Sequence, residues 1–267
     1  MVGSDDNSGR EVVAATEQRS HRLNRTAPNN EPKFAGMRLD CRPGDEATVA
    51  PEQSLFEHFA WLYIFCREKL FRDDTNRIIS ALWPGGAATL GQALIELGCG
   101  PGFYSCRLAK RFQEIKVLGV DRCPSQLTRA RQKAKSLCLQ NCGFEKGNAL
   151  QLAHRDGSFD MVVASRLFTI LPDGARAVAE MFRVLRPGGR CFIAEPRYAS
   201  WASLPLGALW LLAAVTRRAN TYLEPTKPRV LSSGQMHRLF ATQPWKQMNI
   251  WHEGRYHYAT CEKGTTL

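Results

Sequence analysis

A glycine-rich segment flanked by acidic residues is the part of the sequence best suited to bind a ligand. Gly98, Gly100 and Gly102 follow a GxGxG pattern, and Glu96 stands two residues before the first glycine. Glycines let a loop backbone approach a ligand closely, and the start of a following helix offers free N–H groups. Asp121 follows about 20 residues later, where an acid in doubly wound folds hydrogen-bonds ribose hydroxyls. These residues predict a site for a nucleoside-bearing cofactor without a demanding phosphate site.

Such a site needs strands and helices in alternation to position it. Short apolar runs predict five strands, with helical patterns between most of them, at 93–97, 116–120, within 143–150, 159–165 and 190–195. The glycine segment joins the first strand to its helix, and Asp121 closes the second strand. Repeated strand–helix units with short loops imply a parallel, doubly wound sheet that binds its ligand at the carboxyl ends of the strands.

The end of the sequence predicts two further strands, at 247–253 and 255–262, after a helix that begins at Ser232 or Ser233. Only Gly254 separates the two strands, so they are expected to form a hairpin in which one strand runs antiparallel to the sheet. The predicted fold class is therefore α/β: a doubly wound, Rossmann-like, seven-stranded sheet, mostly parallel with one antiparallel strand, plus N-terminal cap helices.

Three regions differ in composition. The first fifty residues contain seven Lys/Arg and eight Asp/Glu and few large apolar side chains, which predicts a disordered polar tail over 1–52. Residues 53–90 predict a helical cap of two helices, with a break near 72–74 where Asp73 or Asp74 would be the N-cap. The main domain is expected over 91–267 and contains an apolar insertion at 197–231.

Several segments together resemble the class I S-adenosylmethionine-dependent methyltransferases. They are LIELGCGPGFYS, VLGVD, GNAL, FDMVVAS and MFRVLRPGGRCFIAEP, and the resemblance extends over roughly residues 90–195. It is closest to the small-molecule and lipid type, and distantly to the ubiquinone and menaquinone C-methyltransferase group. The resemblance implies S-adenosyl-L-methionine as the cofactor and a methyltransferase domain over 91–267. It also implies cofactor contacts from Glu96, Gly98, Cys99, Gly100, Gly102, Asp121, Arg122, Asn148, Ala149, Ser165 and Arg166.

Each of these roles has a purely structural alternative. The resemblance assigns the glycines to the amino-acid end of the cofactor, but they could serve only a tight turn. It assigns Asp121 to the ribose, but this side chain could instead cap the next helix. By the same resemblance, Asn148 and Ala149 lie near the adenine, and Ser165 and Arg166 near the methionyl group. Cys99 fits a small filler better than a nucleophile.

Contacts with the acceptor are harder to read from the sequence. The candidates are Phe59, Tyr63, Phe168, Glu195, Tyr198 and Trp201. Glu195 ends the fifth strand and could contact substrate or form a structural ion pair, while Phe59 and Tyr63 could close over the cofactor or pack in the core. No catalytic acid or base stands out, because His58, His237, His252 and His257 all fit structural roles. No metal site is expected, since the nine cysteines contain no CxxC pair.

The insertion has an apolar centre at 198–216, between Arg197 and Arg217-Arg218. A single membrane crossing is excluded by topology, because the last strands must return to the same sheet. An apolar helix there would form a lid or pocket wall, lie in a membrane interface, contact a second subunit or simply pack. The predicted membrane surface contact is through 198–218.

The predicted function is S-adenosylmethionine-dependent methyl transfer to a small apolar or lipid-like acceptor. A net charge of +11 leaves a nucleic-acid methyltransferase as an alternative. However, residues 165–172 lack the Asn/Asp-Pro-Pro-aromatic turn of base methyltransferases, which argues against a nucleic-acid partner. A protein that binds the cofactor without catalysis is a further alternative. The first residues show no secretory signal pattern, and an odd number of cysteines argues against a disulfide framework. Both predict a cytoplasmic location, peripheral to the membrane if the insertion binds it. The oligomeric state stays open.

Overall fold

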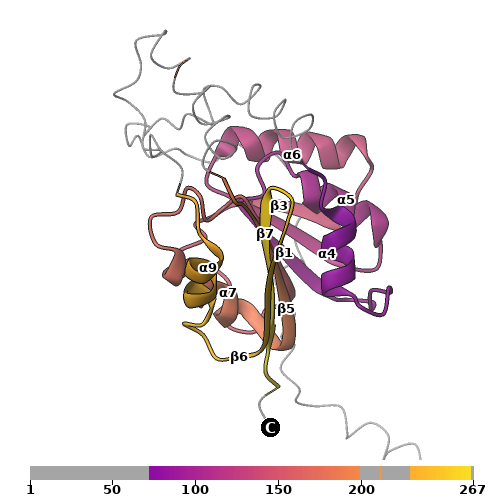
Figure 1. Cartoon of the computed structure of the whole chain (residues 1–267). Coiled ribbons are helices and arrows are strands. Elements are labelled where there is room, and N and C mark those ends of the chain that lie inside the picture. Colours follow the sequence, from indigo (N-terminus) through magenta and orange to yellow (C-terminus); the bar gives the residue numbers. More distant parts are fainter. Residues whose placement is uncertain (1–71, 199–210, 212–228, 266–267) are drawn as a thin grey trace, which may run out of the picture. The chain divides into compact units, whose positions relative to one another are not determined.

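The computed structural model describes residues 72–198, 211 and 229–265, which build one seven-stranded sheet in the order β3-β2-β1-β4-β5-β7-β6 (Figure 1). β1 to β5 pair in parallel, and β7 is antiparallel to both of its neighbours, β5 and β6. This arrangement confirms the predicted fold class. The strands are β1 Ala93–Leu97, β2 Lys116–Asp121, β3 Cys142–Lys146, β4 Phe159–Ser165, β5 Leu185–Pro196, β6 Trp245–Glu253 and β7 Tyr256–Lys263.

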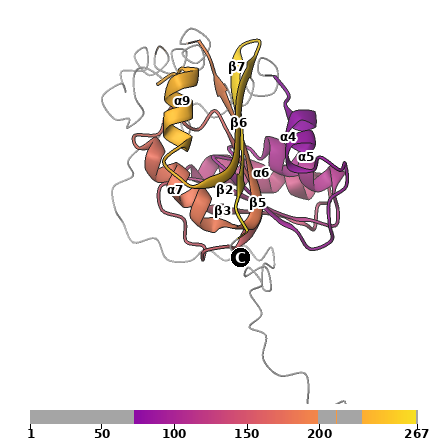
Figure 2. The same ribbon diagram turned by 60° about the horizontal axis from the view of Figure 1, so that its bottom comes forward.

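Helices cover both faces of the sheet. Helices α4, α5 and α6 lie on one face and α7 and α9 on the other, as Figures 1 and 2 show from two directions. Their bounds are α4 Thr75–Leu82, α5 Phe103–Arg111, α6 Pro124–Ser136, α7 Gly174–Val184 and α9 Ser233–Phe240. Two-sided coverage explains why the inner strands are continuous apolar runs rather than alternating ones.

The core is divided by the sheet into two layers. Successive side chains of a strand point to opposite faces, so Leu94 packs with the α4 and α5 side while Ile95 packs with the α7 and α9 side. All five residues of β1 are buried. Tyr104 of α5 and Phe240 of α9 are among the largest fully buried side chains of the two layers. The strand ends that carry the predicted site are thus fixed by a packed scaffold.

The predicted start of the fifth strand is wrong. We expected this strand over 190–195, but β5 already begins at Leu185. Leu185 pairs with Phe159, and a register shift between Phe159 and Met161 accommodates the extra residues as an irregularity in the ladder. The predicted start of α9 is confirmed, because Ser232 and Gln235 form a capping box.

Several sequence predictions lie outside the described residues. They include the tail over 1–52, most of the 53–90 cap, nearly all of the 197–231 insertion, and the candidate residues Phe59, Tyr63 and Trp201. Within 198–216 only Tyr198 and Leu211 are described, with 48% and 69% of their surfaces exposed. Where the chain is described, no helix is both long and apolar enough to cross a membrane.

Candidate active site

The glycine loop after β1 is the first component of the site. Gly98, Gly100 and Gly102 have φ angles of 68°, 51° and 71°, in the left-handed region that favours glycine. The backbone N–H groups of Gly98 and Cys99 donate to the Val120 carbonyl at 2.8 and 3.1 Å. The loop is therefore fastened to the end of β2, and its three glycines adopt a backbone that most other residues would resist.

Two of these glycines also lie too close to neighbours for a side chain. A Cβ atom at Gly98 would lie 2.9 Å from Cδ1 of Leu167, and one at Gly102 would lie 2.8 Å from Cζ of Phe144. Gly102 is the N-cap of α5, so the loop leads directly to the N–H groups of a helix start. The conformation and the close packing together explain why these positions are glycine.

Asp121 at the end of β2 is hydrogen-bonded to the glycine loop. Its Oδ2 accepts from the Gly100 N–H at 2.8 Å, and its Oδ1 accepts from the Cys123 N–H at 2.9 Å. Burial raises the pKa of this carboxyl above its usual range, against the lowering effect of these backbone donors. The contact with Cys123 is a local turn and does not cap α6, whose N-cap is Cys123 and has no side-chain capping bond. The contact with Gly100 joins the acid to the predicted cofactor loop.

Glu96 and Cys99 have supporting positions. Glu96 is buried within β1, and its Oε2 accepts from the backbone N–H of Ser105 at 2.7 Å and from the Ser105 hydroxyl. It thus holds the first turn of α5 against β1. The Cys99 side chain is buried, and burial raises the pKa of its thiol well above the usual range, so the thiol stays protonated. These contacts favour the supporting and filler roles over direct chemistry.

The expected adenine end lies in the loop after β3. The side chain of Asn148 is exposed at the surface and accepts from the Leu150 N–H at 3.0 Å, while Ala149 is buried. Arg122, the residue after Asp121, is also exposed. The strand order places this loop beyond β2, on the side of the glycine loop away from β4. A bound nucleoside could therefore extend from the glycine loop over β2.

The loop after β4 lies on the other side of the glycine loop. Ser165 is the last residue of β4, and Arg166 has a φ of 58°, which is uncommon for a residue other than glycine. The Arg166 N–H donates to the Ala194 carbonyl at 2.8 Å, and its guanidinium donates to the Tyr256 hydroxyl at 3.2 Å. Unusual backbone conformations of this kind concentrate at functional sites.

Glu195 fastens the same loop from β5. Its Oε1 accepts from the backbone N–H groups of Leu167 and Phe168 at 2.7 and 3.0 Å, so the predicted ion pair is replaced by bonds to backbone. Phe168 is buried, with its ring 5.7 Å from that of Phe240 in the core. Its proposed contact with acceptor stays a prediction, as does that of Tyr198, whose exposed ring lies under the Arg197 guanidinium.

Two histidines that the sequence left as structural lie in one row with Glu195. His257 is the cross-strand partner of Glu195 on β7, and His252 of β6 is the cross-strand partner of His257. Directly opposed residues share one face of a sheet, so the three side chains form a row across the strands. His257 is buried, and its Nδ1 lies 3.3 Å from the Ser233 hydroxyl. Burial, with the Arg197 charge, lowers the pKa of His257, so it is neutral at pH 7.

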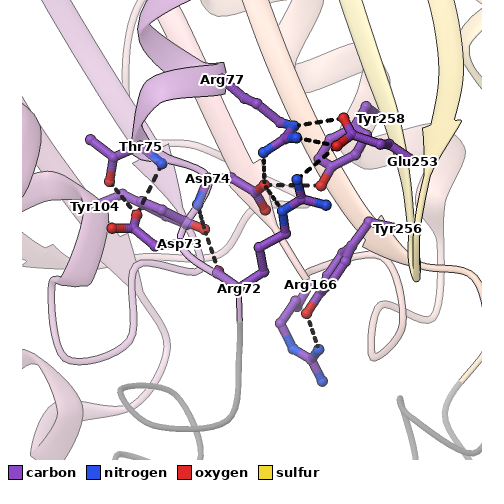
Figure 3. A network of polar contacts seen from close by, with 10 residues as sticks. All are labelled: Arg72, Asp73, Asp74, Thr75, Arg77, Tyr104, Arg166, Glu253, Tyr256 and Tyr258. Carbon is purple, nitrogen blue, oxygen red and sulfur yellow. Dashed lines mark hydrogen bonds and ion pairs between the residues drawn. The ribbon is translucent and has the colours of Figure 1, made fainter.

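A polar network ties α4 to the β6–β7 hairpin at the same edge (Figure 3). The carboxylate of Asp74 is 1% exposed and accepts from the Tyr258 hydroxyl at 2.9 Å. Arg72 and Arg77 lie 3.6 and 3.5 Å from it and also bind Glu253. These arginines lower the pKa of Glu253 to about 2. No sequence pattern pointed to this network, because its members are more than 170 residues apart.

The second helix of the predicted cap, α4, begins where expected, with Asp74 as its N-cap residue. The side chain of Asp74 makes no capping bond, however. Asp73 binds the helix start instead, through its Oδ1, which accepts from the Thr75 N–H at 3.0 Å and from the Thr75 hydroxyl. The Asp74 carboxylate instead accepts the Tyr258 hydroxyl inside the fold and does not cap α4.

The edge as a whole fits a nucleoside-bearing cofactor. The structure brings Gly98, Gly100, Gly102 and Asp121 together as one loop-and-carboxylate cradle, with the Asn148 and Arg166 loops on its two sides. Elsewhere in the described chain, no group of His, Cys, Asp and Glu side chains is arranged to hold a metal ion. The fold and the cradle define an α/β protein of the kind that binds a nucleotide-like cofactor at its strand ends.

Comparisons with known proteins specify this class. The model of the methyltransferase domain matches residues 89–249. The chain is 34% identical over 169 residues to the demethylmenaquinone methyltransferase of Deinococcus radiodurans, covering 59% of this chain and 64% of the relative. Phosphoethanolamine N-methyltransferase 2 of Haemonchus contortus with S-adenosyl-L-methionine superposes with a TM-score of 0.58 at 13% identity, covering 78% of this chain and 56% of that protein. A geranyl diphosphate methyltransferase superposes with a TM-score of 0.53 at 16% identity, covering 71% and 76%.

The chain therefore belongs to the class I S-adenosylmethionine-dependent methyltransferase family, as its motifs predicted. The likeness to the two solved structures, both far below 25% identity, supports the fold alone. The chain spans less than two thirds of the length of the curated relatives it matches, 64% for one and 52% for another.

Proposed function

We propose that this protein transfers the methyl group of S-adenosyl-L-methionine to a small, apolar, lipid-like acceptor that contains a quinone-type ring. The use of S-adenosyl-L-methionine is supported by the hydrogen bond that Asp121 accepts from the Gly100 N–H. This bond joins the glycine loop and the acid that ends β2 into one cradle. The acceptor class is supported by similarity to demethylmenaquinone methyltransferases from two bacteria, at 34% and 31% identity.

Methyl transfer requires the protein mainly to align the cofactor with the acceptor. When bound, S-adenosyl-L-methionine supplies a methyl group already activated on a sulfonium. The glycine loop and Asp121 would hold the cofactor, and the loop that begins at Ser165 would face the acceptor. Fixing two reactants in one orientation and excluding water removes much of the barrier to a bimolecular transfer. The backbone N–H bonds that Glu96, Asp121 and Glu195 accept from a helix start and two loops provide the rigidity that such alignment needs.

Cofactor binding is tested by isothermal titration of the full chain with S-adenosyl-L-methionine. Asp121→Asn keeps an oxygen for the Gly100 N–H but removes the charge, and Asp156→Asn changes a carboxylate on the exposed surface as a matched control. Loss of a charged hydrogen bond costs about 1.5–3 kcal/mol, so affinity should fall about 10- to 100-fold in the first variant and stay unchanged in the second. Absence of binding to the wild-type chain would refute the proposal.

The acceptor class is tested by release of S-adenosylhomocysteine. The substrates to compare are 1,4-naphthoquinol under anaerobic conditions, a phospholipid vesicle, and single- and double-stranded oligonucleotides. Turnover with the naphthoquinol alone supports the proposal. Turnover with oligonucleotides and a steep salt dependence would instead favour the nucleic-acid alternative. Cofactor binding with no turnover on any of them would favour the non-catalytic alternative.

A cytoplasmic site of action at a membrane surface is the remaining part of the proposal. Helices α5 and α6 together carry seven Lys/Arg and no Asp/Glu, which suits an anionic surface. The predicted contact through 198–218 adds an apolar segment, although it lies outside the described residues. Sedimentation with phosphatidylglycerol-containing vesicles should be strong in wild type and weak after deletion of 198–218; binding that survives the deletion would contradict the role of this segment.

A further inference from the structure

Glu195 has one carboxylate oxygen that is occupied and one that is not. Oε1 accepts from the backbone N–H groups of Leu167 and Phe168, while Oε2 is buried without a hydrogen-bond partner. The side chain is only 2% exposed. An unsatisfied buried polar atom is costly, so its presence at a strand end calls for a functional reason.

Its position places this oxygen beside the cofactor cradle. Leu167 connects the two, because its N–H binds Glu195 and its Cδ1 would lie 2.9 Å from a Cβ atom on Gly98. Only β4 separates β1 from β5 in the sheet. With neighbouring strands about 5 Å apart, the end of β5 lies about 10 Å from the end of β1. An acceptor lying next to a cofactor on the glycine loop would therefore reach Glu195.

The surroundings of this carboxyl also suit proton transfer. Burial raises the pKa of Glu195 to about 7, although the backbone donors of Leu167, Phe168 and Thr169 and the Arg166 charge oppose the shift. The other groups near it are His257, which is neutral, His252 farther along the same row, and Arg197, the residue after β5. A base that is half ionised near neutral pH is well matched to removing a proton from a hydroxyl.

We propose that Oε2 of Glu195 removes the hydroxyl proton of a phenol- or quinol-type acceptor as the methyl group is transferred. This inference rests on the proposed function and names the base for it. The acceptor's O–H bond breaks, and its electron pair moves into the ring, so that a ring carbon forms the new bond to the methyl carbon. The carbon–sulfur bond breaks with its electrons left on sulfur. The hydroxyl proton ends on Oε2 and is later released to water.

The substitution Glu195→Gln separates this role from the structural one. The amide oxygen of Gln can still accept from Leu167 and Phe168, so the loop keeps its position, but the group at the place of Oε2 becomes an NH₂ that cannot take a proton. Glu262→Gln is the matched control, because Glu262 lies at the opposite end of β7 and pairs with Arg190 and Lys246.

The first measurement needs no turnover. In cofactor-free protein labelled with ¹³C at glutamate carboxyls, one signal should titrate near pH 7 in wild type and in Glu262→Gln and be missing from Glu195→Gln. In the presence of S-adenosylhomocysteine, adding 1,4-naphthoquinol should shift this signal. A signal that stays unchanged on addition of the naphthoquinol would overturn the inference.

The second measurement is the pH profile of methyl transfer to 1,4-naphthoquinol. Wild type and Glu262→Gln should lose kcat about tenfold per pH unit below about pH 7, because Glu195 is then protonated. Glu195→Gln should bind S-adenosyl-L-methionine normally, lose about 10²- to 10⁴-fold in kcat and lack the acidic limb. Full activity in this variant, or a lower rate with the acidic limb retained, would overturn the inference. Failure of wild type to bind the cofactor would instead refute the proposed function.

Discussion

Replacement of Gly102 by alanine tests whether the cofactor cradle is close-packed as well as unusually folded. Gly102 has a φ of 71°, and a Cβ atom there would lie 2.8 and 2.9 Å from two carbons of the Phe144 ring and 3.0 Å from Cβ of Ala130. Phe144 is itself buried in a small cluster with Cys99 and Leu127. The ring therefore cannot move aside without disturbing the loop on which the cofactor would lie.

The expected cost has two sources. A residue with a side chain in the left-handed region costs about 1–2 kcal/mol. Forcing an extra methyl group into a well-packed core costs about 1–3 kcal/mol more. Gly102→Ala should thus lower the free energy of unfolding by about 2–5 kcal/mol, which is a large share of the 5–15 kcal/mol typical of a domain.

Gly86→Ala provides the matched control. Gly86 has a φ of 76°, but no heavy atom lies within 4 Å of its Cβ position. It should therefore show only the conformational cost of about 1–2 kcal/mol. Urea unfolding of both variants, with slopes compared to wild type, separates the packing contribution. If Gly102→Ala is no less stable than Gly86→Ala, the close contact with Phe144 makes no contribution to the free energy of unfolding, and the expected packing cost is refuted.

Three further outcomes follow from the buried and paired groups. Tyr258→Phe removes the hydroxyl that binds the buried Asp74 carboxylate and should cost about 1.5–3 kcal/mol in urea unfolding. The pKa of Glu253 is lowered to about 2 by its two arginine partners, so its contribution to stability is present above the unfolded pKa near 4.3. The stability difference between wild type and Glu253→Gln should shrink as the pH falls from about 4.3 to 2. The pKa of Glu195 is raised to about 7, so wild type should lose stability relative to Glu195→Gln as the pH rises from about 4.3 to 7.

The sheet could be predicted because its signals are local. The mainly apolar runs at 93–97 and 159–165 match β1 and β4 to the residue, since parallel strands covered by helices on both faces are apolar along most of their length. The start of α5 could also be predicted, because glycine spacing reports backbone geometry directly. Asp121 could be predicted as the acid that ends β2. The early start of β5 was missed, because pairing of Leu185 with a neighbouring strand depends on tertiary contacts.

The acceptor side of the site was less visible for a physical reason. Glu195 could be named from its place at a strand end, but its bonds to Leu167 and Phe168 depend on the fold of a loop nearly thirty residues away. His257 was judged structural because nothing in the sequence brings it opposite Glu195. That juxtaposition follows from an antiparallel register, which a hairpin sequence alone does not determine.

Three carboxylates at this edge of the sheet accept backbone N–H groups in the same way but differ in whether their second oxygen has a partner. Glu96 on β1, Asp121 on β2 and Glu195 on β5 each accept a backbone N–H from a loop or helix start, so each fixes the segment next to its strand. In Asp121 both oxygens accept backbone N–H bonds. In Glu195 one oxygen holds the loop and the other is left buried and free. A carboxylate retained only for support would be replaceable by glutamine at no loss of rate, so Glu195→Gln distinguishes support from chemistry at the residue where the two meet.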